Sequence, residues 1–246
     1  MEIYLIRHGQ STNNALMENQ HLRVYDPTLT EIGHQQAQKL ADYLIEAPNL
    51  EDLVRIKVSA EERKQHYPHQ FTHIYCSAMH RAMQTAAPIA KAFNLPLEIW
   101  VDIHEHGGIF LETAEGIIGY GGKTRSEISA EFENVVIPES ITDAGWWDAT
   151  RGQEDLASVY ARAVRVSMEL RARAQNENHK DDKVALVSHG MFINTLLKAF
   201  FDMVPSERQH FWHYNTAVTR VDLLEGDILT LRYTNRVTHL PPTHIT

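Results

Sequence analysis

The chain has 246 residues, of which 43% are hydrophobic and 22% charged, and this composition is typical of one globular domain. The formal net charge of -9 argues against binding to nucleic acid or to an anionic membrane surface, because both carry dense negative charge. No stretch of about 18 consecutive apolar residues occurs, so no membrane span is expected. We predict a single domain over residues 1–246, with insertions at about 50–70 and 104–153.

The cysteine content and the N-terminal pattern favour a cytoplasmic protein. Cys76 lies in an apolar stretch, which is typical of a core residue, and a single cysteine cannot form an intrachain disulfide. The first ten residues show no basic segment followed by a long apolar one, so no signal peptide is expected. The sequence leaves the oligomeric state open.

Short apolar runs typical of buried strands alternate along the chain with segments of helical periodicity. The predicted strands are residues 3–6, 71–77, 97–101 and 184–188. The predicted helices are residues 31–47, with Thr30 as the N-cap, 82–93, 154–174 and 191–200. Residues 217–224 and 228–233 alternate around Glu225-Gly226-Asp227 and predict a hairpin. Strands separated by helices indicate a layered α/β sheet, whose ligands bind at the carboxyl ends of the strands.

Residues 104–153 break this alternation. The segment holds two glycine pairs, a proline and Trp146-Trp147, with only a short suggestion of helix near 127–132. So long an irregular segment in a compact domain usually serves function or forms a small subdomain. We expect it to cover the binding crevice and select the substrate. Burial against the domain is favoured for the two tryptophans over a place in the pocket wall.

Two of the predicted strands end in the same polar pattern, Arg7-His8-Gly9 and Ser188-His189-Gly190. A third strand ends at Ser77, and Arg81 follows four residues later in the first turn of the next helix. The carboxyl ends of parallel strands lie at one edge of a sheet, so these side chains are expected to converge there. The converging residues are Arg7, His8, Arg81 and His189.

Such a group suits phosphoryl transfer. Arginine is always charged, and its planar fork matches the oxygens of a phosphoryl group. Histidine supplies a neutral ring nitrogen near pH 7 that can attack phosphorus and hold it as a phosphohistidine. Two cation-capable residues at the end of a buried apolar run would be costly without a charged partner, which argues against a purely structural role for Arg7 and His8.

The pattern resembles the histidine phosphatase superfamily, also called the phosphoglycerate mutase-like family. Arg7, His8, Gly9, Ser11 and Asn14 match the opening signature of the family in order. Three further segments resemble its later blocks: DPTLTEIGHQQA at 26–37, SAMHRAMQTA at 77–86 and SHG at 188–190. Residues 50–70 and 104–153 match no motif of the family.

The resemblance implies a three-layer α/β/α sandwich around a central, mostly parallel sheet. It also implies that His8 is the nucleophile that becomes phosphorylated and that His189 is the second histidine of the catalytic pocket. Arg7, Arg81 and His189 would then bind the phosphate, with Asn14 as an additional contact. A turn-forming role for Asn14 is nearly as well supported.

The resemblance also implies a general acid just after the third predicted strand, where Glu105 lies. A carboxyl beside a phosphate pocket can have its pKa raised by the charge of the substrate and can protonate the leaving group. Members of the family place a glycine four residues after this acid, whereas here Gly107 and Gly108 come sooner. Asp102 and Glu112 therefore remain alternatives.

The leading hypothesis is a metal-independent phosphatase that hydrolyses a small phosphorylated metabolite and needs no cofactor. The mutases of the family carry Glu-Arg-His-Tyr at the position of the acid, whereas this chain has Glu105-His106-Gly107-Gly108, which favours hydrolysis over phosphoryl transfer to a second hydroxyl. A non-catalytic phosphate-binding module is a further alternative, although such a protein would be expected to lose a pocket residue. A metal site at His104 and His106, or at His66 and His69, lacks the usual ligand spacing.

Overall fold

The computed structural model describes residues 1–49 and 68–246. Most of the insertion expected at 50–70, including His66, lies outside the described residues. A seven-stranded sheet has the order β6-β3-β2-β7-β1-β8-β9. Its strands are β1 (Glu2–Arg7), β2 (His73–Cys76), β3 (Leu97–Ile99), β6 (Val135–Val136), β7 (Lys183–Ser188), β8 (Val218–Leu224) and β9 (Ile228–Arg236). All pair in parallel except β8 and β9, so the predicted mostly parallel α/β fold is confirmed.

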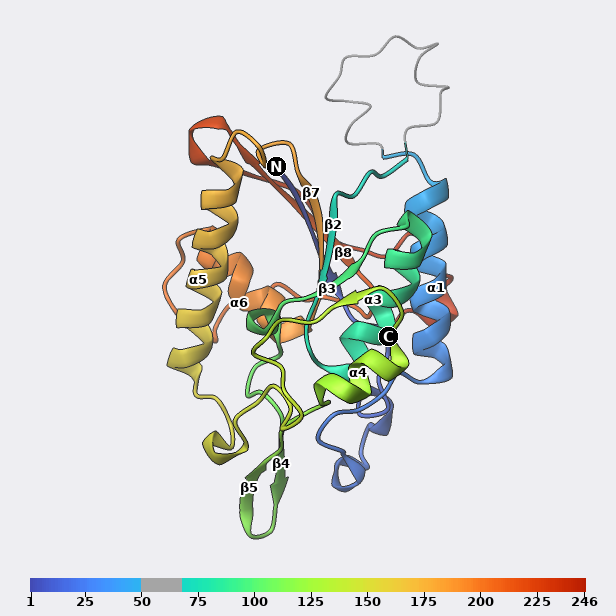
Figure 1. The fold of residues 1–246 in the computed structure, drawn as a ribbon, viewed down its shortest axis with the longest axis vertical. Coiled ribbons are helices and arrows are strands. Elements are labelled where there is room, and N and C mark those ends of the chain that lie inside the picture. Colours follow the sequence, from blue (N-terminus) through green and yellow to red (C-terminus); the bar gives the residue numbers. More distant parts are fainter. Residues whose placement is uncertain (50–67) are drawn as a thin grey trace.

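Helices cover both faces of this sheet (Figure 1). They are α1 (Glu31–Glu46), α3 (His80–Phe93), α4 (Arg125–Glu131), α5 (Leu156–Ala174) and α6 (Gly190–Phe200). Helices α1 and α3 lie on one side of the sheet, and α5 and α6 lie on the other. Short 3-10 helices occur at Asn14–Leu16, Gln20–Leu22, Val101–Ile103, Ala149–Arg151, Glu225–Asp227 and Pro242–His244.

The helices begin where the capping residues of the sequence allow. The Thr30 side chain accepts a hydrogen bond from Gly33 N at the start of α1, as the sequence predicts. Helix α5 begins at Leu156, two residues later than expected, because the Asp155 side chain caps it by accepting from Ser158 N.

Residues 104–153 contain more regular structure than the sequence predicts. Strands β4 (Phe110–Thr113) and β5 (Gly116–Gly119) form a separate hairpin, and the two-residue strand β6 adds an edge to the main sheet. The hairpin projects at one end of the molecule (Figure 1). Its strands have only four residues each, too few for a recognisable alternation of apolar and polar residues.

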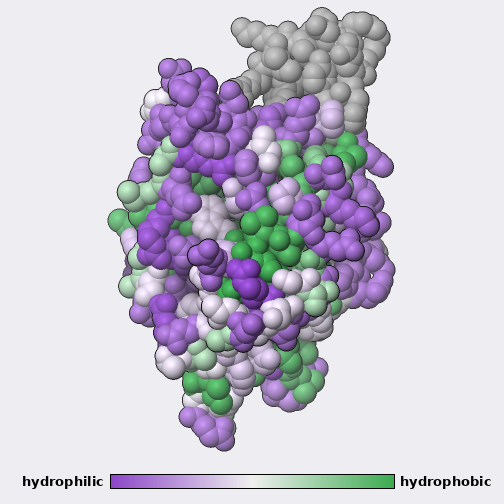
Figure 2. Space-filling view, viewed as in Figure 1, coloured by the Kyte–Doolittle hydropathy of each residue, from purple (hydrophilic) through white to green (hydrophobic). Residues whose placement is uncertain are grey.

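The face seen in Figure 2 is mostly hydrophilic, with apolar side chains gathered near its centre. Within the described part of the chain, no helix has both the length and the apolar character needed to cross a membrane.

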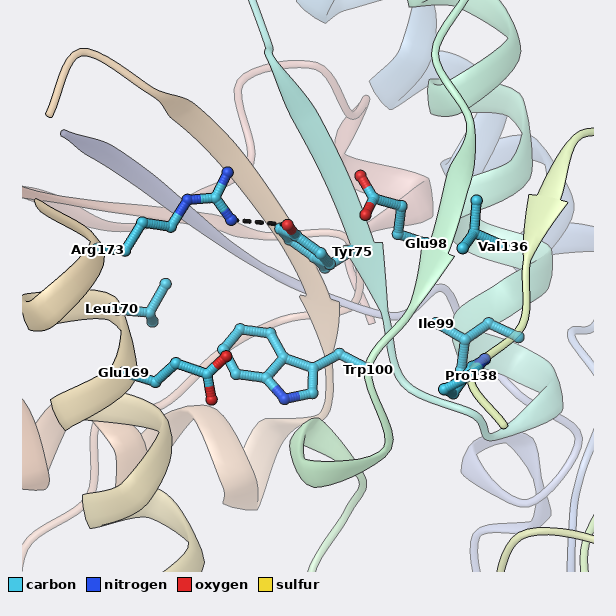
Figure 3. Close-up of a pocket in the computed structure, with 9 residues that line it drawn as sticks. All are labelled: Tyr75, Glu98, Ile99, Trp100, Val136, Pro138, Glu169, Leu170 and Arg173. Carbon is cyan, nitrogen blue, oxygen red and sulfur yellow. Dashed lines mark hydrogen bonds between the residues drawn. The ribbon is translucent and has the colours of Figure 1, made fainter. Parts of the chain in front are cut away.

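A cavity of about 230 Å³ lies between β3, β6 and α5 (Figure 3). Tyr75, Glu98, Trp100, Glu169 and Arg173 contribute to its lining, and Arg173 Nη1 donates a hydrogen bond to the Tyr75 hydroxyl. None of the site residues predicted from the sequence lines this cavity.

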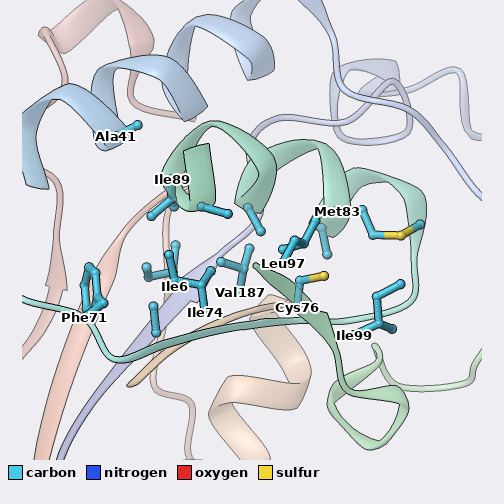
Figure 4. Close-up of a cluster of buried hydrophobic side chains, with 14 of the residues drawn as sticks. Ile6, Ala41, Phe71, Ile74, Cys76, Met83, Ile89, Leu97, Ile99 and Val187 are labelled. Carbon is cyan, nitrogen blue, oxygen red and sulfur yellow. The ribbon is translucent and has the colours of Figure 1, made fainter. Parts of the chain in front are cut away.

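Alternate side chains of β1 pack into two hydrophobic clusters, one on each face of the sheet. Tyr4 and Ile6 pack with α1 and α3, whereas Ile3 and Leu5 pack with α5 and α6. Figure 4 shows the first cluster, in which Ile6, Cys76 and Val187 lie beneath α3. Cys76 is fully buried, which confirms its assignment to the core.

Replacing Leu40 tests the packing of α1 against the sheet. Leu40 is 0% exposed, so Leu40→Ala should lower the free energy of unfolding by about 3 kcal/mol through lost burial and the cavity left behind. Ile45 lies on the same helix at 38% exposure, and Ile45→Ala should cost less than about 1 kcal/mol. Urea titration measures both, and similar losses would contradict this packing.

Candidate active site

The pairing of β1 with β7 brings the two signature histidines together. Arg7 is in register with Ser188, and His8 N donates to Ser188 O at 2.9 Å, so the residue after each strand lies at the same edge. The ring centroids of His8 and His189 are 5.1 Å apart. Both residues are buried, at 3% and 0% exposure.

Hydrogen bonds fix the orientation and tautomer of the His8 ring. Nδ1 lies 2.6 Å from Gly9 O, and Nε2 lies 3.2 Å from Arg81 Nε, which can only donate. The ring hydrogen is therefore assigned to Nδ1, and Nε2 carries a lone pair. Gly9 itself lies against α1, because a Cβ on it would come within 2.6 Å of Gly33 O.

Burial keeps the His8 ring neutral. Desolvation lowers the pKa of His8 well below its usual value of 6.5, and the neighbouring charges of Arg81 and Arg7 lower it further. The pKa of His189 is lowered in the same way, first by desolvation and then by Arg81. A neutral imidazole with no hydrogen on Nε2, where the lone pair accepts from Arg81 Nε, is the form that can act as a nucleophile.

The two arginines reach the histidines from different elements. Arg81 lies in the first turn of α3, where Asp26 Oδ1 is 3.8 Å from its Nη1 and accepts from His80 N at 3.1 Å. Arg7 ends β1, and its Nη1 donates to His213 O at 2.6 Å. Within the described residues, the buried Nε of Arg7 has no hydrogen-bond partner, so it can donate to an anion.

His189 is oriented from β2. The Ser77 hydroxyl accepts from Met79 N at 3.2 Å and lies 2.8 Å from His189 Nε2, so its own hydrogen can be donated to that nitrogen. The ring hydrogen then belongs to Nδ1, which is buried and has no partner among the described residues. His189 does not line the groove above His8, in contrast to Arg7, His8 and Arg81, and it contacts the site through its ring beside His8.

The carboxylate of Glu105 caps the N-terminus of α6. Its Oε1 accepts from Phe192 N and from His106 N, both at 2.9 Å, and its Oε2 lies 3.4 Å from Met191 N. Glu105 is close enough to Arg7 and Arg81 to favour the charged form of both guanidinium groups. The structure thus places Glu105 with the pocket residues predicted from the sequence.

The two alternative acids differ in position. A groove above His8 is lined by Arg7, Arg81 and Glu105. The Asp102 side chain is 43% exposed, lies 3.9 Å from Arg165 and does not line this groove. Glu112 lies on β4 and lines the same groove.

Asn14 lines the groove and is solvent-exposed. Its Oδ1 accepts from Ser11 N at 3.1 Å and from Asn215 Nδ2 at 3.4 Å. The side-chain NH₂ group of Asn14 is therefore the part available to an anion.

The groove above His8 has a volume of about 890 Å³. Residues of the loop after β1, of α3 and of segment 104–153 line it, and among them are Arg7, Arg23, Arg81, Glu105 and Glu112. Trp147 is 7% exposed, and it packs with Ile109 of the same segment and with Met79, which precedes α3. The expected burial of Trp147 is therefore confirmed. The partly buried Trp146 packs against the same cluster.

The histidines considered as metal ligands have other contacts. His104 Nδ1 lies 2.7 Å from Val101 O, and its Nε2 lies 3.5 Å from Glu154 Oε2. His69 Nδ1 lies 3.1 Å from Leu44 O. In the residues described, no group of three or more His, Cys, Asp or Glu side chains is arranged to hold a metal ion.

Three residues that hold Arg7, His8 or Arg81 in place were not predicted from the sequence. Asp26 pairs with Arg81, the His213 carbonyl holds Arg7, and Asn215 Nδ2 donates to His8 O at 2.8 Å. Asp26 is the first residue of the segment 26–37 that resembles the family, so the sequence could have indicated a role for it. The other two lie just before β8, about 200 residues from His8, and only the folded chain reveals their role.

The family model of the histidine phosphatase superfamily (branch 1) matches residues 3–63 and 58–236. The chain therefore belongs to this superfamily, and it is an enzyme of the phosphohydrolase type.

Solved structures share the fold at low sequence identity. A phosphoserine phosphatase mutant from Entamoeba histolytica, in complex with phosphoserine, aligns with a TM-score of 0.58 and 21% identity over 98% of this chain and 99% of its own. A mycobacterial glucosyl-3-phosphoglycerate phosphatase in complex with VO3 aligns with a TM-score of 0.56 and 18% identity over 96% and 99%. No curated protein sequence matches the chain significantly.

The neutral state of His8 predicts a dependence of stability on pH. Below about pH 6.5 the unfolded histidine binds a proton that the folded ring resists, so unfolding becomes easier by up to about 1.4 kcal/mol per pH unit as the pH falls. The His8→Asn variant lacks this contribution and should lose less stability between pH 7 and pH 5. Urea titrations at both values measure the difference, and equal losses would show that the ring is not held neutral.

Proposed function

We propose that the protein is a metal-independent phosphatase that hydrolyses small phosphomonoesters through a phosphohistidine at His8. The observation that carries this proposal is the placement of the His8 ring in the groove lining, with Nδ1 2.6 Å from Gly9 O and Nε2 3.2 Å from the buried Arg81 Nε. A nucleophile and a phosphate-binding cation therefore lie side by side in the same groove.

The first step transfers the phosphoryl group to the enzyme. His8 Nε2 attacks phosphorus, the bond from phosphorus to the ester oxygen breaks, and Arg7, Arg81 and His189 bind the phosphoryl oxygens. The Gly9 carbonyl, which accepts from His8 Nδ1, stabilises the positive charge that develops on the ring. The buried, charged arginines neutralise the phosphoryl group in the transition state.

The second step returns the enzyme to its starting state. During the first step, the protonated Glu105 has given its proton to the leaving alkoxide. In the second step, the resulting carboxylate takes a proton from the water that attacks the phosphohistidine. Inorganic phosphate leaves as the bond from phosphorus to Nε2 breaks. The position of Glu105 in the groove lining, near both arginines, supports this role over Asp102 and Glu112.

The substrate class follows from the groove. Its volume of about 890 Å³ suits a small phosphorylated metabolite, and the structural neighbours include complexes with phosphoserine and 3-phosphoglyceric acid. Residues of segment 104–153, including Glu105, His106, Phe110 and Glu112, form one wall of the groove. We therefore assign substrate selection to this segment, as an insertion within a single domain.

Removing the nucleophile tests the covalent route. His8→Ala should lower kcat on p-nitrophenyl phosphate by about 10³-fold or more, because alanine cannot form the phosphohistidine. Wild type quenched during turnover under alkaline denaturing conditions should carry a phosphoryl group that mass spectrometry locates on His8. His34→Ala, on the exposed face of α1, serves as the control and should retain activity. Near-wild-type turnover by His8→Ala would refute the mechanism.

Product analysis separates hydrolysis from mutase chemistry. With 3-phosphoglycerate, wild type should release inorganic phosphate faster than it forms the 2-phospho isomer, because the chain has His106 and Gly108 at the positions where the mutases of the family carry Arg and Tyr. Activity should survive treatment with a strong chelator. Predominant isomer formation would favour the mutase, and a loss restored by zinc would favour a metal enzyme.

A further inference from the structure

Glu105 lies on an irregular segment, yet the backbone around it is held at four carbonyl groups. Arg162 Nη1 donates to Asp102 O and to His104 O, both at 2.8 Å. The Ser188 hydroxyl donates to Ile103 O at 2.7 Å. On the other side of Glu105, Glu154 N donates to Gly107 O at 3.0 Å. The path of the chain at Glu105 is therefore set largely by contacts from Arg162 and Glu154.

These two residues form a buried bidentate pair. Arg162 Nε lies 3.0 Å from Glu154 Oε1, and Nη2 lies 2.6 Å from Oε2, with the residues 2% and 6% exposed. The Arg162 guanidinium also lies over the Phe192 ring at 4.5 Å, and Phe192 N is a donor to the Glu105 carboxylate. One guanidinium thus contacts both the backbone that carries Glu105 and the helix end that holds its carboxylate.

Neither Arg162 nor Glu154 lines the groove above His8. Arg162 points from α5 toward the backbone behind Glu105, so it cannot touch a substrate bound at His8. Its hydrogen bonds influence the reaction through the position of Glu105, and its charge also contributes to lowering the pKa of His189, after desolvation and Arg81. A buried ion pair is a weak source of stability, because the cost of desolvating two charges offsets much of their attraction.

We propose that the Arg162–Glu154 pair is a positioning clamp that aims the Glu105 carboxyl at the leaving oxygen. The proposal rests on the role of Glu105 as the general acid under the proposed function. Displacement of a catalytic group by about 1 Å can cost about 10²-fold in rate, so a clamp on the backbone of the acid has a direct catalytic consequence.

The basicity of the leaving group separates a positioning role from a structural one. p-Nitrophenolate is a weak base and leaves with little help from an acid, whereas an alkoxide needs a proton as it leaves. In the phosphoryl-transfer step, which kcat/KM reports, a misaimed Glu105 therefore slows alkyl phosphates and spares p-nitrophenyl phosphate, whereas its role toward water in the second step is common to both substrates. A general loss of folded protein lowers both activities by the same factor.

The test compares kcat/KM for p-nitrophenyl phosphate and glycerol phosphate in wild type, Glu105→Gln, Arg162→Lys and Glu154→Gln. Lysine keeps the charge facing Glu154 but lacks the fork that reaches both carbonyls and the carboxylate. Arg162→Lys should lower kcat/KM on glycerol phosphate by about tenfold or more and on p-nitrophenyl phosphate by less than about threefold. Glu154→Gln should show the same selectivity, and it supplies the result if Arg162→Lys does not fold.

A matched control is available in Arg220, which is 0% exposed and pairs with Asp222 at 2.8 Å and with Glu2 at 3.1 Å. Arg220→Lys disturbs an equally buried pair away from Glu105, so it should change both activities by one common factor. The double variant Glu105→Gln/Arg162→Lys should be no more selective than Glu105→Gln alone, because the clamp has no acid left to position.

The outcomes distinguish the two levels of the proposal. If Glu105→Gln is selective but Arg162→Lys and Glu154→Gln lower both activities equally, the clamp is overturned and the proposed acid stands. If Glu105→Gln itself is not selective, the assignment of the acid fails, and the clamp fails with it.

Discussion

The parallel pairing of β1 with β7 is the contact on which the rest of the site depends. It places His8 beside His189, and the adjacent pairing of β2 with β7 brings Ser77 to the same edge. A slip of one residue in either register would turn the β1 side chains to the opposite face and break the packing of Ile3 and Ile6 in their separate clusters. Burial of the β1 side chains on both faces therefore fixes the geometry of the candidate active site.

Burial also gives the site its electrostatic character. The chain as a whole is acidic, yet Arg7 and Arg81 are held together at the base of the groove, with Asp26 the carboxylate paired to Arg81 among the described residues. Desolvation lowers the pKa of His8, the charge of the two arginines lowers it further, and the same charge attracts an anion. One arrangement thus keeps the ring neutral and favours binding of a phosphoryl group beside it.

The sequence predicted the regular part of the fold well and the irregular part poorly. Helix α1 and strands β1 and β7 lie within one or two residues of their predicted bounds, because their apolar patterns are long and their ends carry clear turn or cap residues. Hairpin β4–β5 and strand β6 were missed, because each of these strands holds only two consecutive apolar residues, too few for a strand signal.

By itself, the sequence determined the chemical groups of the site: two strand endings that each carry a histidine, and a nearby arginine at a helix start, which matched one superfamily. The tertiary structure decided what supports them. His213, Asn215 and Arg162 act through backbone contacts with residues distant in sequence, and such contacts leave no local pattern. Residue type and strand position are local properties of the chain, whereas the orientation of His8 and Glu105 depends on which distant groups the packing of the sheet and helices brings to them.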